Sequence, residues 1–93
     1  MITTVVRNDE RSRYDIVVDD QVVGHTDYRL EGDRQVFVHT EIDPAHRGRD
    51  LAEQLVGAAL DDARDNGMSV VPRCPYVARF IEEHPEYGDL VAP

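Results

Sequence analysis

The spacing of hydrophobic residues changes once along this chain, from that of a strand to that of a helix. This change limits the folds that the chain can adopt. Residues 35–42 alternate with the period of two that is typical of a β-strand, whereas apolar residues between 51 and 63 recur at helical spacing. The segment between them, residues 43–50, is short enough to be a turn. A strand that passes into a helix through a turn predicts an α/β fold, in which the helix packs on a sheet.

Three further strands are predicted before this point, over residues 3–6, 14–18 and 22–30, with turn-forming residues between them. Gly24 inside the third strand predicts a bulge or a bend. In the fourth strand, regular alternation would place two sets of residues on opposite faces. These are Val36, Val38, Thr40 and Ile42 on one face, and Phe37, His39 and Glu41 on the other.

The C-terminal third predicts a last strand and a second helix. Gly67 is a stop signal for the first helix, and residues 68–71 form a short β candidate. Pro75 suits the first position of a helix that reaches Glu83, with Cys74 as its N-cap. The order ββββ-α-β-α predicts one α/β domain, residues 1–93, with a mostly antiparallel sheet and helices packed on it.

Composition narrows the range of partners. The net charge of −9 argues against nucleic acid and anionic membranes, and it favours a cationic acceptor such as an amine. The chain has no apolar run long enough to span a membrane.

The single cysteine, Cys74, cannot form an internal disulfide and predicts a cytoplasmic setting. The histidines and this cysteine lack the spacing of zinc motifs, so no metal site is predicted.

The strongest candidate site is the corner from Asp43 to Ala52. It places two arginines and a glycine where the strand passes into the helix. The start of a helix presents unpaired backbone N–H groups and the positive end of the helix dipole. Such a corner suits a phosphate group, so the sequence predicts a phosphorylated cofactor.

A family resemblance follows from this corner and from three further blocks. The corner sequence Arg47-Gly48-Arg49-Asp50-Leu51-Ala52 resembles the pyrophosphate motif of the GNAT superfamily of N-acetyltransferases. The other blocks are similar to its smallest, single-domain (mini-GNAT) branch: His39-Thr40-Glu41, Cys74-Pro75-Tyr76-Val77 and His84-Pro85-Glu86-Tyr87. The resemblance covers nearly the whole chain. It implies a mini-GNAT α/β sandwich and transfer of acetyl from acetyl-CoA to an amine.

The resemblance also implies where acetyl-CoA binds. The pyrophosphate would lie at the backbone amides of Arg47, Gly48, Arg49, Leu51 and Ala52. Ile42 would lie beside the pantetheine arm, and Tyr76 would bring a hydroxyl near the thioester unless it serves packing alone. Asp50 stands where the motif has its central glycine. Its charge either faces the diphosphate and weakens binding, or it points outward or pairs with Arg47 or Arg49 at little cost.

His39 and Glu41 are the candidate proton acceptors, because residues two apart share one face of a strand. The resemblance assigns the general-base role to Glu41. His39, with an ordinary pKa of about 6.5, could accept the proton at neutral pH, which favours His39 for the chemistry and Glu41 for orientation. A histidine that merely packs at the rim is the alternative.

Cys74 has two interpretations. A thiol at a helix start has a lowered pKa, so it could take an acetyl group or give a proton to the departing CoA sulfur. The alternative is a small buried residue that fits a tight corner.

Only a turn, residues 8–13, joins the first two strands, where larger members of the superfamily have helices that shape the acceptor pocket. An open acceptor side is therefore expected. The sequence predicts an N-acetyltransferase-like protein that acts on an amine or peptide. The alternatives are a non-catalytic acyl-CoA-binding or regulatory module, and a partner-binding domain in which Asp50 has ended cofactor binding.

Overall fold

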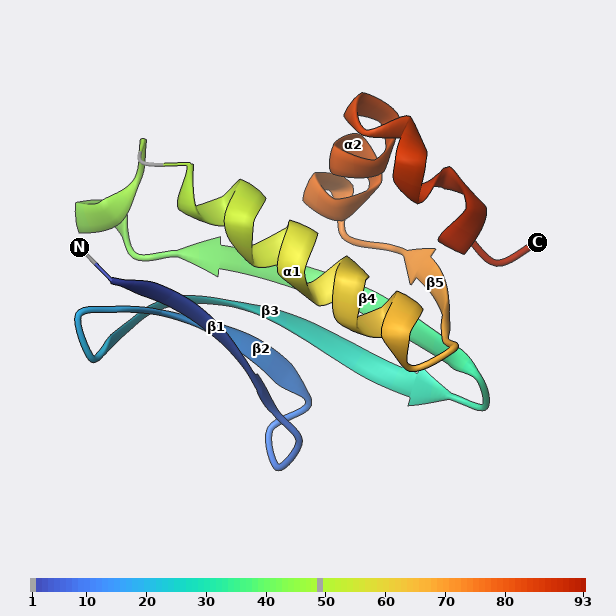
Figure 1. Cartoon of the computed structure of the whole chain (residues 1–93), viewed down its shortest axis with the longest axis horizontal. Helices are drawn as coiled ribbons and strands as arrows, with labels where there is room; N and C mark the ends of the chain where they lie inside the picture. The colour runs from blue at the N-terminus through green and yellow to red at the C-terminus, as the bar shows by residue number, and fades with distance from the viewer. Residues whose placement is uncertain (1, 49) are drawn as a thin grey trace.

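The computed structural model describes residues 2–48 and 50–93, and it contains one five-stranded sheet with helices on it (Figure 1). The elements in chain order are β1 (Thr3–Asn8), β2 (Arg13–Val18), β3 (Gln21–Glu31), β4 (Arg34–Ile42), the 3-10 turn η1 (Pro44–His46), α1 (Leu51–Asp65), β5 (Ser69–Pro72), α2 (Pro75–Glu83) and the 3-10 turn η2 (Pro85–Leu90). Strands β1 to β4 are antiparallel neighbours, and β5 joins β4 in parallel. The predicted α/β class and element order are confirmed.

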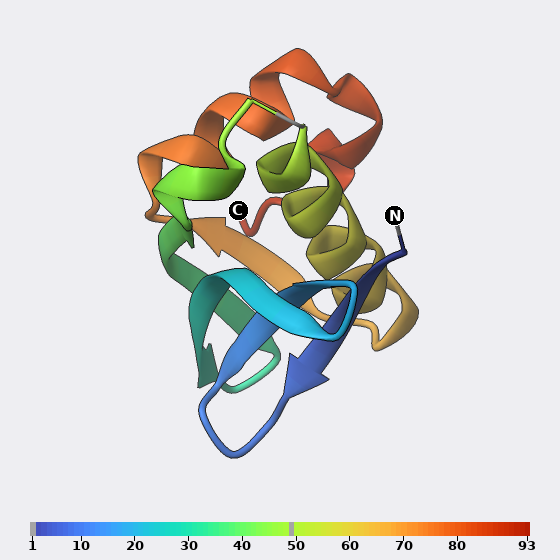
Figure 2. The same ribbon diagram turned by 90° about the vertical axis from the view of Figure 1, so that its left-hand side faces the viewer.

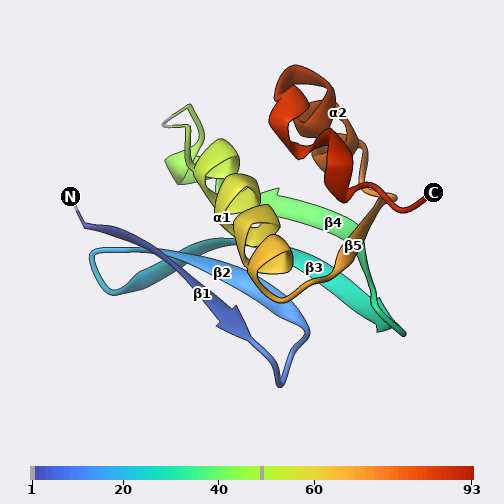
Figure 3. The same cartoon turned by 45° about the vertical axis from the view of Figure 1, so that its right-hand side comes forward.

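Both helices lie on the same side of the sheet, as Figures 1 and 3 show. Figure 2 shows the sheet below α1 in end view. The helices and the inner face of the sheet share one hydrophobic core, in which Ile16, Leu55 and Val77 are fully buried. The opposite face of the sheet has no helix of the described chain packed on it. The face of the sheet that packs on the helices therefore forms the hydrophobic core, whereas side chains on the opposite face point outward.

A β-bulge at Val38 corrects the predicted faces of β4. Phe37 pairs with Tyr28 and His39 pairs with Asp27, so Val38 has no partner on β3. The bulge inserts one residue and reverses the alternation. Phe37 therefore joins Ile42 in the core, and Val38, expected beside Ile42, is 37% exposed. The prediction of an uninterrupted alternation was wrong, because it assumed a regular ladder.

The bulge predicted near Gly24 is confirmed one residue earlier. Ile16 of β2 pairs with Gly24 and the next residue, Val17, pairs with Val22, which leaves Val23 without a partner on β2. Gly24 is required for a different reason, the close approach of β4. A Cβ at this position would lie 2.5 Å from Ile42 Cδ1 and 2.7 Å from the Glu41 carbonyl oxygen.

The substitution Gly24→Ala is expected to lower the free energy of unfolding by about 1–3 kcal/mol, the usual cost of overpacking. The added methyl must push the C-terminal end of β4 away, because one of its close neighbours is backbone. Urea denaturation measures the change. Gly88→Ala is the matched control, since no described atom lies within 4 Å of its added Cβ, and its effect is expected to stay within about 0.5 kcal/mol. Equal effects of the two substitutions would contradict the role assigned to Gly24.

Candidate functional site

Strands β4 and β5 pair over only part of their length. The parallel ladder runs from Arg34–Ser69 to Phe37–Pro72, and the backbone N–H of Cys74 then donates to the Phe37 carbonyl at 2.8 Å. From Cys74 the chain turns into α2, while β4 continues to Ile42. In the described part of the chain, the last residues of β4 therefore pair with β3 but not with β5. An unpaired strand edge offers backbone donors and acceptors to a ligand.

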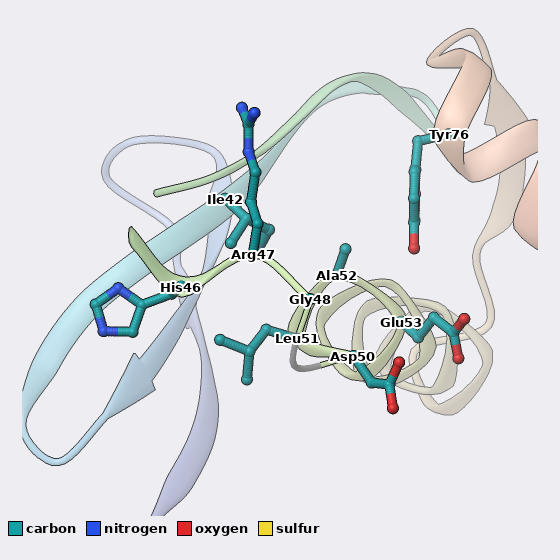
Figure 4. Close-up of a pocket in the computed structure, with 9 residues that line it drawn as sticks. All are labelled: Ile42, His46, Arg47, Gly48, Asp50, Leu51, Ala52, Glu53 and Tyr76. Atoms are coloured by element: carbon teal, nitrogen blue, oxygen red, sulfur yellow. The ribbon is translucent and has the colours of Figure 1, made fainter. Parts of the chain in front are cut away.

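This free edge lines a groove. One hollow of about 320 Å³ runs along β4 and is lined by His39, Thr40 and Glu41 among others. A second hollow, of about 200 Å³, lies at the corner between β4 and α1 (Figure 4). Both are lined by the same four residues, Ile42, Arg47, Ala52 and Tyr76. The two hollows therefore form one continuous groove from the start of α1 to the middle of β4.

Two described residues of the corner, on either side of position 49, have a positive φ. Gly48 has a φ of 84°, and Asp50, the N-cap of α1, lies in the left-handed region with a φ of 58°. The Asp50 side chain makes no capping hydrogen bond within the described chain, so the first N–H groups of α1 lack the usual side-chain acceptor. Arg47 adds a positive charge to the same wall. Arg49, expected to contribute a phosphate-binding amide, lies outside the described residues.

Two carboxylates oppose this positive potential. Asp50 and Glu53 both line the corner hollow, and Figure 4 shows them beside the start of α1, with the Arg47 guanidinium pointing the other way. Asp50 therefore lies at the rim of the site rather than paired with Arg47. A unit charge 4 Å from a phosphate charge would cost about 1 kcal/mol in water and about 4 kcal/mol at a dielectric of 20. The charge of Asp50 therefore opposes an anion in the corner hollow.

Tyr76 reaches across the groove from the first turn of α2 (Figure 4). Its side chain lines both hollows. Burial, followed by the negative charges of Glu53 and Glu83, raises the pKa of the Tyr76 hydroxyl. The phenol therefore stays protonated at neutral pH and can act as a hydrogen-bond donor in the groove.

Cys74 is the N-cap of α2, as predicted, and its thiol contacts Thr40 of the groove. The residue is only 4% exposed, and its thiol donates to Thr40 Oγ1 at 3.4 Å. Thr40 Oγ1 in turn lies 2.9 Å from Thr26 Oγ1. Thr40 was not among the predicted site residues. Its place on β4 two positions before Ile42 was the signal available, because residues two apart share a face.

His39 and Glu41 lie at the other end of the groove, where both line the hollow along β4. Their side chains are more than half exposed, and His39 Nε2 lies 3.9 Å from Glu41 Oε1. The predicted placement of these two residues on one face of β4 is confirmed. The structure adds His25 of β3, whose Nε2 lies 3.9 Å from Glu41 Oε2. His25 was not among the predicted site residues, because its neighbours are set by the register of β3 and β4.

A family model described as GCN5-related N-acetyl-transferase matches residues 13–90. The chain belongs to this family. Among curated relatives, the NATD1 protein of Danio rerio is 37% identical over 67 residues, which make up 69% of this chain and 61% of the relative. This family member therefore spans about three fifths of the length of the curated relatives it matches.

Solved structures show the same fold. A GCN5-like protein of Staphylococcus aureus superposes with a TM-score of 0.73 at 16% identity, over 96% of this chain and 87% of its own. N-acetylglutamate synthase of Neisseria gonorrhoeae, solved with coenzyme A and N-acetyl-glutamate, gives a TM-score of 0.61 at 15% identity, over 94% of this chain and 26% of its own. The architecture is thus that of the acetyltransferase family.

Among the described residues, neither helix has the length and apolar character needed to span a membrane.

Native Cys74 is expected to react with Ellman's reagent at least about 100-fold more slowly than in urea-unfolded protein. Its burial requires a local opening, and this ratio corresponds to an opening free energy of about 2.7 kcal/mol. Absorbance of the released thiolate measures the rate. Because the chain has one cysteine, no background subtraction for other thiols is needed. Equal rates in native and unfolded protein would contradict the buried position of the thiol.

Proposed function

We propose that this chain binds acetyl-CoA in the groove and transfers the acetyl group to an amine. The observation that carries the proposal is the continuity of the groove. It runs from the uncapped start of α1 to the free edge of β4 and ends at His39 and Glu41. Membership of the acetyltransferase family supports the same reaction.

The residues present fit the proposed ligand at both ends. The amides at the start of α1 and the Arg47 guanidinium would bind the diphosphate, because an uncapped helix start attracts anions. The free edge of β4 near Ile42 would pair with the amides of the pantetheine arm, as a further strand would. Acetyl-CoA would supply an acetyl group activated as a thioester. Asp50 and Glu53 oppose this fit and would limit the affinity.

The proposed proton acceptor is His39, and Glu41 orients it. Attack by an amine nitrogen on the acetyl carbonyl would form a C–N bond and break the C–S bond of the thioester, so that CoA would leave as a thiolate and the nitrogen would have to lose a proton. His39 lines the end of the groove and its side chain is open to solvent on the outer face of β4, so it can take that proton and release it to water. Glu41 Oε1 lies 3.9 Å from His39 Nε2, so the carboxylate can hold the imidazole in place while it takes the proton.

Cys74 keeps two proposed roles. Its thiol hydrogen is directed at Thr40, which itself lines the groove. In one role, the hydrogen bond between Cys74 and Thr40 positions the free edge of β4, and the Cys74 thiol supplies a proton to the departing CoA sulfur. In the other, the thiol accepts the acetyl group before the amine does, which requires it to move out of its buried position.

The proposed acceptor is a cationic amine, such as a polyamine or a basic peptide. The turn between β1 and β2 is short, so no long connection from this part of the chain covers the end of the groove. The net charge of −9 would attract a cation over a longer range. The second candidate function, a partner-binding domain that has lost cofactor binding, is favoured by the two carboxylates at the diphosphate end.

The experiment that tests the function combines calorimetric titration with acetyl-CoA and an assay of CoA release with spermidine or a basic peptide. We expect binding in the micromolar to millimolar range and amine-dependent release. His39→Gln is expected to lower the transfer rate by about 100-fold or more, and Glu41→Gln by about tenfold, without loss of acetyl-CoA affinity. Both losses follow from removal of the proton acceptor and its partner.

Glu31→Gln is the matched control, since Glu31 lies at the β3–β4 hairpin away from the groove and its variant should transfer acetyl at the wild-type rate. Intact-mass measurement in the same assay detects an acetylated protein if Cys74 takes part covalently. Binding without amine-dependent release would favour the non-catalytic module. Absence of binding at millimolar acetyl-CoA would leave a partner-binding domain.

Asp50→Asn is expected to tighten acetyl-CoA binding by up to about tenfold, because it removes a charge at the diphosphate end and asparagine tolerates the left-handed conformation. Calorimetry measures the dissociation constant. Asp50→Gly separates the charge from the backbone, since glycine adopts the same φ without strain. An unchanged dissociation constant in both variants would mean that the Asp50 carboxylate is too well solvated to affect the ligand.

A further inference from the structure

Three potential metal ligands meet on the face of the sheet that carries no helix. One ligand atom from each of His25, His39 and Glu41 lies within 4.8 Å of the other two. Glu41 extends one carboxylate oxygen toward each imidazole, and both of these separations are 3.9 Å. Spacing along the sequence predicted no metal site, because these residues are separated by a hairpin.

The strand register fixes this arrangement. His25 is the cross-strand partner of Glu41, and Asp27 is the partner of His39. Directly opposed residues hold their Cβ atoms about 4.5–5.5 Å apart, and residues two apart on a strand share a face. The bulge at Val38 lies next to His39 and keeps it in register with Asp27. The cluster therefore rests on paired backbone rather than on a loop.

Two imidazoles and one carboxylate are a ligand set that zinc uses in sites with an open fourth position. Imidazole also suits Cu²⁺ and Ni²⁺, whereas Mg²⁺ prefers oxygen ligands alone. Tetrahedral zinc with bonds of about 2.0–2.1 Å needs ligand atoms about 3.3 Å apart. His39 and Glu41 are 57% and 58% exposed, so small side-chain rotations can close the present separations.

The charges around the cluster favour a cation. Asp27 Oδ1 lies 3.0 Å from Arg13 Nε, so the charge of Asp27 is already offset. Asp27 Oδ2 lies 3.6 Å from His25 Nε2 and helps to hold this imidazole, whose side chain is 18% exposed. The ion-pair partners that the structure gives Glu41 are both histidines, which are neutral when they act as ligands. One negative charge is thus left for the metal.

We infer that His25, His39 and Glu41 bind a divalent transition metal of the zinc class. Metal binding uses the imidazole lone pair of His39 and the carboxylate of Glu41, the groups that the proposed reaction needs for its proton. A bound metal would therefore suppress acetyl transfer. This consequence rests on the proposed function, whereas the binding itself does not.

The test is competition for Zn²⁺ between the chelator-treated 93-residue chain and a chromophoric zinc chelator. We expect one Zn²⁺ per chain, and a dissociation constant at least about tenfold weaker for His25→Gln, since loss of even an outer partner of a metal ligand costs about 10–100-fold. His46→Gln is the matched control and should keep the wild-type Zn²⁺ affinity, because His46 lines the groove corner instead. Excess Mg²⁺ should displace no Zn²⁺.

A structural readout accompanies the titration. In NMR spectra of the wild-type protein, Zn²⁺ should shift the ring signals of His25 and His39 and leave those of His46 and His84 in place. Failure of the protein to compete with the chelator, equal affinities of the two variants, or shifts spread over all four histidines would overturn the inference. None of these measurements depends on acetyl transfer, so a failure of the metal site and a failure of the proposed reaction are distinguishable.

Discussion

The separation of β4 from β5 is the constraint on which the rest of the site depends. The ladder between them ends at Phe37. The Cys74 N–H donates a hydrogen bond to the Phe37 carbonyl, and the chain then turns into α2. Pro72 contributes to this ending, since proline has no N–H with which to extend a ladder. The end of β4 is then left with one free edge, and α1 and α2 form walls on either side of it. A fully paired β5 would fill the groove.

The strand β4 serves two environments at once. Thr40 and Ile42 face the groove and the core, while His39 and Glu41 face outward. Such a division needs strict alternation at the end of the strand, and the bulge at Val38 allows it without losing Phe37 from the core. The glycine at position 24 lets β3 approach closely at the same level. The packing of β4 against the core thus fixes the positions of His39 and Glu41 on its outer face.

The diphosphate end of the groove carries opposing charges within a strongly acidic chain. Arg47 and the amides of α1 favour an anion, whereas Asp50 and Glu53 oppose one. An acidic residue near a helix start is also stabilised by the helix dipole, so stability and anion binding compete for the same potential. The affinity for a phosphorylated ligand therefore depends more on the direction of these two carboxylates than on the number of arginines in the corner.

The sequence by itself determined the element order, the mostly antiparallel sheet, the corner between strand and helix and the N-cap at Cys74. These features depend on local periodicity and on glycine and proline, whose effects act within a few residues. Only the tertiary structure decided that Val38 bulges, that Thr40 receives the Cys74 thiol and that His25 meets His39 and Glu41. These depend on strand register, which is a cooperative result of packing across the whole sheet and is not written in the spacing of neighbouring residues.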